Sequence, residues 1–174
     1  MVGRELTELF PKTDHPIGDV VLEVSDLTNP AYFRNVSFTV RKGEIVALAG
    51  LVGSGRSEIA RSIFGVDSYE TGSVKINNKP LKKNSPITAM AEKIALVPED
   101  RRQQGLFMVA GVNRNISMES FDRLKGRIFL NFKKERALTN EWRENLSIKY
   151  VNQSDPVDRL SGGNQQKTVL AKWL

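Results

Sequence analysis

The sequence contains no cysteine and only one histidine among its 174 residues. Without cysteine the chain can form neither a disulfide nor a thiolate metal site, which is compatible with a reducing compartment. His15 stands alone in a proline-flanked stretch, and we expect it to be solvated. Long apolar runs are also missing, since none approaches the roughly 18 residues of a membrane span. With 40% hydrophobic and 26% charged residues, the chain is nevertheless typical of a globular domain.

Aromatic residues are few, at 7%, while positive charge is in excess. The net charge is +6, and residues 101–149 alone contain eleven Lys or Arg against five Asp or Glu. A basic surface can attract nucleic acid, anionic lipid or nucleotide. Here the basic residues alternate with acidic and apolar ones, which favours a solvated helix face. The interleaved aromatic side chains that stack on single-stranded bases are missing, so we predict no nucleic-acid partner.

The most informative stretch lies between residues 45 and 64. Residues 45–49 form a short apolar run with β-branched side chains, which predicts a buried strand. A glycine-rich loop follows, and residues 58–64 then have helical spacing. A strand, a glycine loop and a helix are the context that a phosphate-binding loop needs. The loop reads Gly50-Leu51-Val52-Gly53-Ser54-Gly55-Arg56-Ser57.

Each residue type in this loop suits a phosphate. Its three glycines let backbone N–H groups face inward, and the helix start adds the positive end of its dipole. Arg56 and Ser57 would then reach a terminal phosphate and a magnesium ion. Arginine stands where lysine is usual, and its planar, bulkier guanidinium is not a neutral replacement. We therefore predict nucleotide binding without competent hydrolysis; the alternative is a glycine turn that binds no ligand.

Around this loop the sequence indicates a β layer. Residues 20–27 and 35–40 alternate in polarity, and together with residues 45–49 they predict an antiparallel layer that feeds the nucleotide strand. Tyr32 or Phe33, between the first two strands, is a candidate to stack on adenine, and a core or turn aromatic is the equal alternative. Further predictions are a strand at 73–76 with its turn at Asn77-Asn78, a helix capped by Ser85, and a buried strand at 94–97.

Helical patterns dominate the second half of the chain. They predict helices near 112–118 and 131–146, with Phe132 and Trp142 in the core of a small helical subdomain. A second motif, Leu160-Ser161-Gly162-Gly163-Asn164-Gln165-Gln166-Lys167, then runs into an apolar-periodic segment. Ser161 suits a helix N-cap, and the two glycines keep side chains away from the helix start. The motif is thus a second candidate anion site, or else ordinary capping.

Together, the two motifs resemble the ATPase domains of ABC transporters. In that family the first motif (Walker A) binds ATP, and the second, the signature motif, caps the γ-phosphate of ATP held by a partner domain. The resemblance is narrower still to the second ATPase half of bacterial importers for simple sugars such as ribose, galactose or xylose. It rests on Gly50–Ser57 with Arg for Lys, on Val97-Pro98-Glu99-Asp100-Arg101-Arg102, and on the Asn-Gln-Gln-Lys ending of the signature.

The resemblance implies an α/β P-loop NTPase fold of the ABC ATPase type, with an antiparallel β layer and a small helical subdomain. Met1-Val2-Gly3-Arg4 resembles the junction between two tandem halves, so residues 1–19 are expected to form an interdomain linker or arm. The other expected parts are a nucleotide-binding α/β core with its β layer at 20–104, a helical subdomain at 105–159, and the signature with the start of its helix at 160–174.

Carried over residue by residue, the resemblance implies two half-sites for ATP and Mg²⁺. Ser57 would bind the metal. Glu99 falls where most such ATPases have a glutamine that senses the γ-phosphate, the magnesium and the membrane partner, and its carboxylate adds repulsion beside phosphates. The first half-site would comprise Gly50, Leu51, Val52, Gly53, Ser54, Gly55, Arg56, Ser57 and Glu99. The signature half-site would comprise Leu160, Ser161, Gly162, Gly163, Asn164 and Gln165.

In the family, a strand ending in the magnesium Asp and the catalytic Glu follows the signature helix, and a switch His comes later. The sequence reaches Leu174 before any of them. We therefore expect a truncated piece whose core sheet lacks a central member, and which has no appreciable ATPase activity alone. No catalytic residue is assigned.

The resemblance also implies partners. These are the first ATPase half, a membrane permease docked through residues near 99–120, and indirectly a sugar-binding protein, at the cytoplasmic face of the bacterial inner membrane. The alternative is a non-catalytic regulatory or interaction module that binds nucleotide to hold an assembly together. The two hypotheses differ in whether nucleotide is hydrolysed or only bound.

Overall fold

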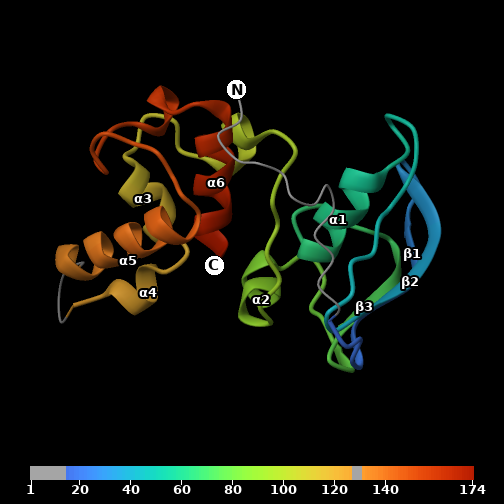
Figure 1. Ribbon diagram of the computed structural model, residues 1–174. Coiled ribbons are helices and arrows are strands. Elements are labelled where there is room, and N and C mark those ends of the chain that lie inside the picture. Colours follow the sequence, from blue (N-terminus) through green and yellow to red (C-terminus); the bar gives the residue numbers. More distant parts are fainter. Residues whose placement is uncertain (1–14, 127–130) are drawn as a thin grey trace. The chain divides into compact units, whose positions relative to one another are not determined.

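The computed structural model describes residues 15–126 and 131–174, and the chain divides into two compact units, 1–94 and 95–174 (Figure 1). Most of the predicted arm, including Met1–Arg4, lies outside the described residues. Within them, no helix is both long enough and apolar enough to cross a membrane.

The first unit contains an antiparallel sheet that includes two of the three strands predicted for the β layer, those at 20–27 and 35–40. Its sheet has the order β2-β1-β3-β4, and every neighbouring pair is antiparallel. Asn77 and Asn78 form the turn after β3 with φ of 49° and 64°, the left-handed values that a tight hairpin requires. The strands are β1 (Val20–Asn29), β2 (Phe33–Arg41), β3 (Thr71–Ile76) and β4 (Lys79–Pro80).

Two helices complete this unit, α1 (Arg56–Phe64) and α2 (Pro86–Ala91). Ser85 caps α2 as predicted, because its hydroxyl accepts a hydrogen bond from the Thr88 amide. Helix α1 packs against the sheet through Ile59 and Ile63. The shared core consists of Val24, Leu27, Phe33, Ile59, Ile63, Tyr69 and Val74.

Two predicted strands, at 45–49 and 94–97, are wrong. Both segments are irregular, and Ile45 is 97% exposed. A strand with apolar residues on both faces is stable only between neighbouring strands and under covering helices. In the described part of the chain, neither segment joins the four-stranded sheet. The two segments therefore have the apolar sequence of a buried strand, but among the described residues they lack the neighbouring strands that would bury their side chains.

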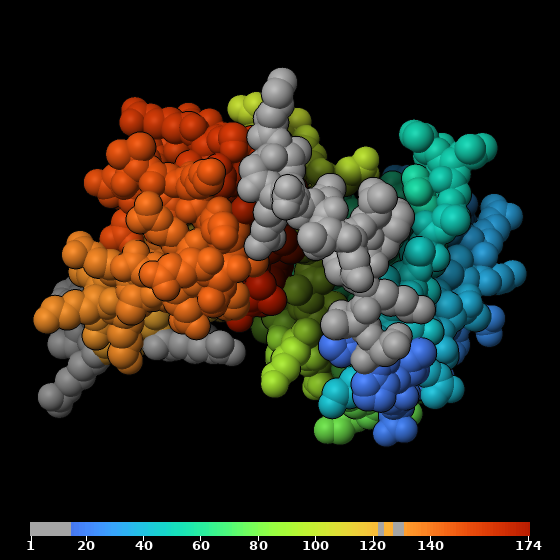
Figure 2. All heavy atoms as spheres, viewed as in Figure 1, coloured from blue at the N-terminus to red at the C-terminus, as the bar shows by residue number. Residues whose placement is uncertain are grey.

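The second unit is helical. Its core contains Leu106, Val112, Ile116, Ile148, Val157, Val169 and Ala171. Residues after 131, orange to red in Figure 2, form one closely packed mass on the viewed face. The elements are a π-helical turn η1 (Arg101–Gly105), α3 (Val112–Ser117), α4 (Phe121–Leu124), α5 (Phe132–Asn145), a 3-10 turn η2 (Val157–Arg159) and α6 (Gly162–Trp173).

The helices predicted near 112–118 and 131–146 are confirmed, but only one of the two predicted core aromatics is. Trp142 packs against the core, whereas Phe132 is 62% exposed. Phe132 opens α5 directly after its cap, Asn131, and its ring lies 5.3 Å from the Arg114 guanidinium. A side chain at the first position of a helix lies at the end of the packed face, where fewer core residues surround it.

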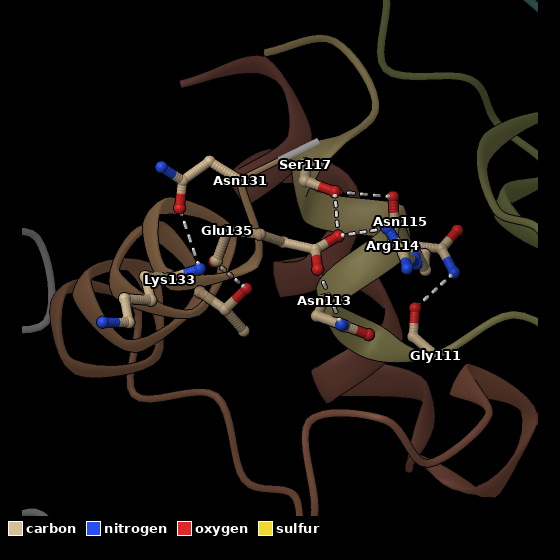
Figure 3. A network of polar contacts seen from close by, with 9 residues as sticks. Gly111, Asn113, Arg114, Asn115, Ser117, Asn131, Lys133 and Glu135 are labelled. Carbon is tan, nitrogen blue, oxygen red and sulfur yellow. Dashed lines mark hydrogen bonds and ion pairs between the residues drawn. The ribbon is translucent and has the colours of Figure 1, made fainter. Parts of the chain in front are cut away.

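Helices α3 and α5 are joined by a buried carboxylate, Glu135 (Figure 3). Its oxygens accept hydrogen bonds from the side-chain amide of Asn113 (Nδ2) at 3.2 Å, from Arg114 Nη1 at 2.9 Å and from Ser117 Oγ at 2.9 Å. A buried carboxylate is tolerated when charge and hydrogen bonds compensate its desolvation. This network fixes the relative position of the two helices.

Candidate functional site

The glycine loop at 50–55 leads directly into the first turn of α1. Gly53 and Gly55 have φ of 82° and 85°, in the left-handed region that other residues adopt at a cost. Between them, the Ser54 amide donates to the Leu51 carbonyl at 3.1 Å and closes a tight turn. The first amides of a helix have no intrahelical acceptor, and they carry the positive end of the helix dipole. The loop therefore presents a helix start of the kind that binds anions.

The loop is open to solvent except where it rests on the β layer. Residues 50–54, Arg56 and Ser57 are exposed, whereas Gly55 is buried. A Cβ at Gly55 would lie 2.6 Å from the Tyr32 carbonyl oxygen, but a Cβ at Gly53 would meet no atom of the described residues within 4 Å. The space around Gly53 and the exposed Arg56 and Ser57 fit a polyphosphate and its magnesium ion.

The two aromatic candidates for adenine stacking separate in the structure. Phe33 is buried in the core of the first unit, so the core interpretation holds for it. Tyr32 is 57% exposed, and its backbone is the surface on which Gly55 rests. Of the two residues, Tyr32 is the one that is exposed to a ligand.

Glu99 lies in the second unit and is exposed. The next residue, Asp100, caps η1, because its carboxylate accepts hydrogen bonds from the amides of Arg102 and Gln103 at 2.9 and 3.0 Å. The phosphate loop belongs to the first unit. The two predicted parts of the nucleotide site therefore belong to different units.

The signature motif forms the start of α6. Ser161 occupies the N-cap position, and Ser161, Gly162 and Gly163 are all exposed. The Ser161 hydroxyl does not cap the helix amides; it accepts a hydrogen bond from the Asn164 side chain at 3.0 Å. Among residues 15–126 and 131–174, no atom lies within 4 Å of the place that a Cβ on Gly163 would take. This helix start is thus also open to a ligand.

The last two predicted signature residues make intramolecular bonds. The Asn164 side-chain oxygen accepts from the Lys149 amide at 2.9 Å. The side chain of Gln165, which is 4% exposed, donates to the Val157 and Leu160 carbonyls and accepts from Arg101 Nε. Sequence reasoning did not single out Arg101, because its link to Gln165 spans 64 residues and no local pattern indicates it.

The model of the ABC transporter family matches residues 33–174 of this chain. The chain belongs to the ABC transporter family. Among curated ABC relatives, it is 51% identical over 174 residues to the ribose import ATP-binding protein RbsA of Rhodococcus jostii. It is 47% identical to the putative ribose/galactose/methyl galactoside import ATP-binding protein 1 of Rhizobium etli. Each match covers 100% of this chain, but 35% and 33% of the two relatives, so the chain spans about a third of their length.

Solved ABC structures share the fold. The ATP-binding cassette MJ0796, a dimer bound to ADP and phosphate, matches with a TM-score of 0.69 at 20% identity, over 88% of this chain and 68% of that one. CbiO1 from Clostridium perfringens, part of an ABC transporter complex, matches with a TM-score of 0.67 at 21% identity, over 90% and 61%. The predicted α/β P-loop NTPase fold of the ABC ATPase type is confirmed.

Proposed function

We propose that this chain is a nucleotide-binding, energy-coupling part of an ABC importer for simple sugars. The observation that carries the proposal is the exposed glycine loop in front of α1, with Gly53 and Gly55 in left-handed conformations. The names of the relatives, which describe ribose and galactose import, supply the substrate class.

In this proposal the amides of residues 53–57 and the Arg56 side chain hold the phosphates of ATP, and Ser57 Oγ holds Mg²⁺. Mg²⁺ would neutralise part of the charge on the terminal phosphates. Tyr32 is the candidate to stack on the adenine. Arg56 carries its charge on a planar fork rather than a compact ammonium, which makes this loop a binding site more than a hydrolytic one.

The signature motif would act on a different nucleotide. The open helix start at Ser161–Gly163 supports a role in capping ATP bound by a partner ATPase domain. In the proposal the chain is the second of two tandem halves, and the first half is its partner. The permease would dock near residues 99–120 at the cytoplasmic face of the membrane, and a sugar-binding protein would deliver the substrate.

A second candidate function is a regulatory module that binds nucleotide without hydrolysing it. Arg56 and Glu99 favour it, since both depart from residues that support hydrolysis in the family. In either function the phosphate loop binds ATP; they differ in what this half contributes after binding.

A double substitution, Arg56→Lys with Glu99→Gln, separates the two in the assembled importer. If this half couples ATP to transport, restoring the usual residues should raise steady-state ATP hydrolysis several-fold, and adding Ser57→Ala should remove the gain. Unchanged hydrolysis in the double variant would contradict energy coupling by this half and favour the binding-only module.

A further inference from the structure

We propose that Arg101 is a positioning residue that holds the signature loop, residues 157–163, in the conformation that faces ATP. The proposal rests on the function proposed above for the signature motif. It concerns residues of the second unit alone, and it adds a residue that lies 59 positions before Leu160, the first residue of the motif.

Arg101 contacts the signature at two points. Its Nε donates a hydrogen bond to Gln165 Oε1 at 3.2 Å. Its Nη2 lies 2.8 Å from the place where a Cβ on Gly162 would be, so any side chain at 162 would displace the guanidinium. The guanidinium thus covers one side of the helix start, and Gly162 is needed for this close approach.

Gln165 passes this restraint to the loop. Its side-chain nitrogen donates to the Val157 carbonyl at 3.1 Å and to the Leu160 carbonyl at 3.2 Å. The side-chain amide of Gln165 has its acceptor, Oε1, and its donor, Nε2, on different atoms. A group that donates to Oε1 therefore orients the amide so that Nε2 faces the two carbonyls. Arg101 supplies that donor. The side chain therefore ties both ends of η2 to the first turn of α6.

A second contact holds the other end of η1 against the same helix. Lys172 Nζ, in the last turn of α6, donates to the Gly105 carbonyl at 3.1 Å. Residues 101 and 105 are therefore both hydrogen-bonded to α6, and in the proposal a displacement of that helix also displaces the turn between them. Glu99 lies two residues before Arg101. A shift of the backbone at Glu99 on binding nucleotide or permease would reach the signature loop through Arg101 and Gln165.

Hydrogen exchange of the 174-residue chain tests the positioning directly. In wild type, the Leu160 and Gln165 amides are bonded to the Val157 and Ser161 carbonyls. In Arg101→Ala we expect both to exchange about tenfold faster, the effect of losing one hydrogen bond to a charged group. Arg101→Lys, which keeps a cationic donor, should restore part of the protection. Arg136→Ala, an exposed arginine of α5 in the same unit, should change neither amide.

The Ile148 amide, bonded to the Arg143 carbonyl in the same unit, reports overall stability. It should keep its wild-type rate in Arg101→Ala. Unchanged exchange at Leu160 and Gln165 would overturn the proposal. Equal acceleration at all three amides would also overturn it, because Arg101 would then stabilise the unit as a whole rather than position the loop.

The assembled importer provides the functional readout. We expect Arg101→Ala to raise the KM for ATP several-fold with little change in kcat, since the loop would reach its ATP-facing conformation less often. Arg136→Ala, an exposed arginine of α5 outside the proposed docking region, should leave both constants unchanged. Faster exchange at Leu160 and Gln165 with an unchanged KM would support the positioning role and contradict the function proposed for the signature.

Discussion

Gly55 is the residue on which the geometry of the phosphate loop depends most. Its φ is 85°, and a Cβ there would lie 2.6 Å from the Tyr32 carbonyl oxygen. Gly53 has a nearly identical φ of 82° but open space around it. The two glycines therefore separate the cost of a left-handed backbone from the cost of a steric clash.

We expect Gly53→Ala to lower the free energy of unfolding by about 1 kcal/mol, the usual cost of a left-handed conformation. Gly55→Ala should lower it by about 2–4 kcal/mol, because the loop must also move away from Tyr32. Urea denaturation of both variants measures the difference. Equal losses in the two variants would show that Gly55 does not rest on the strand connection.

Some residues of the candidate site could be predicted from the sequence, and others could not. Each glycine, Arg56 and Ser57 could be placed at a helix start from spacing alone, since the loop and helix are contiguous in the chain. The roles of Asp100, Arg101 and Gln165 could not, because they depend on backbone conformation and on contacts between distant segments. Phe132 was misplaced in the core for a related reason: the helical period does not show where the first turn leaves the packed face.

At the scale of elements, the antiparallel sheet is held by cross-strand pairs as well as by its core. Glu23 of β1 lies opposite Lys75 of β3, and Lys75 Nζ contacts Glu23 Oε1 at 2.8 Å. The hydrogen bond from Lys75, aided by its charge, lowers the pKa of Glu23 below the ordinary value of 4.5. The folded state therefore binds this proton less readily than the unfolded chain does.

The lowered pKa of Glu23 predicts that the fold loses stability in acid. The pair stabilises the fold above about pH 4.5, and its contribution should disappear as the pH falls through the lowered pKa of Glu23. The difference in unfolding free energy between wild type and Glu23→Gln should therefore shrink between pH 6 and about pH 3. In a Lys75→Gln background that shrinkage should be absent; its persistence there would contradict the assignment to this pair.

Elements differed in how well their sequences predicted them. Helices α2 and α5 carry their own caps, Ser85 and Asn131, and the β3–β4 hairpin has its Asn77-Asn78 turn, so local chemistry sufficed. The segments at 45–49 and 94–97 have clear strand composition, but in the described chain neither pairs with a strand of the sheet. A buried strand is a property of a sheet, and its own sequence shows only that it would suit one.

At the scale of the whole molecule, two open helix starts lie in two separate compact units. The family explains why one chain carries both, and the proposed function assigns them to different nucleotides. The Arg101–Gln165 link then gives the second unit a means of presenting its helix start. The proposed nucleotide-binding function of the chain depends on the first helix start, at α1, binding the phosphates of ATP.

The most direct test is a titration of the 174-residue chain with a fluorescent ATP analogue, with and without Mg²⁺. The account predicts saturable binding that Mg²⁺ strengthens, with Ser57→Ala reducing the Mg²⁺-dependent part about tenfold. Ser68→Ala, at an exposed serine of the same unit outside the loop, serves as the matched control and should retain the Mg²⁺ effect. Binding that is absent, or that is the same in wild type and Ser57→Ala with Mg²⁺, would contradict the central claim.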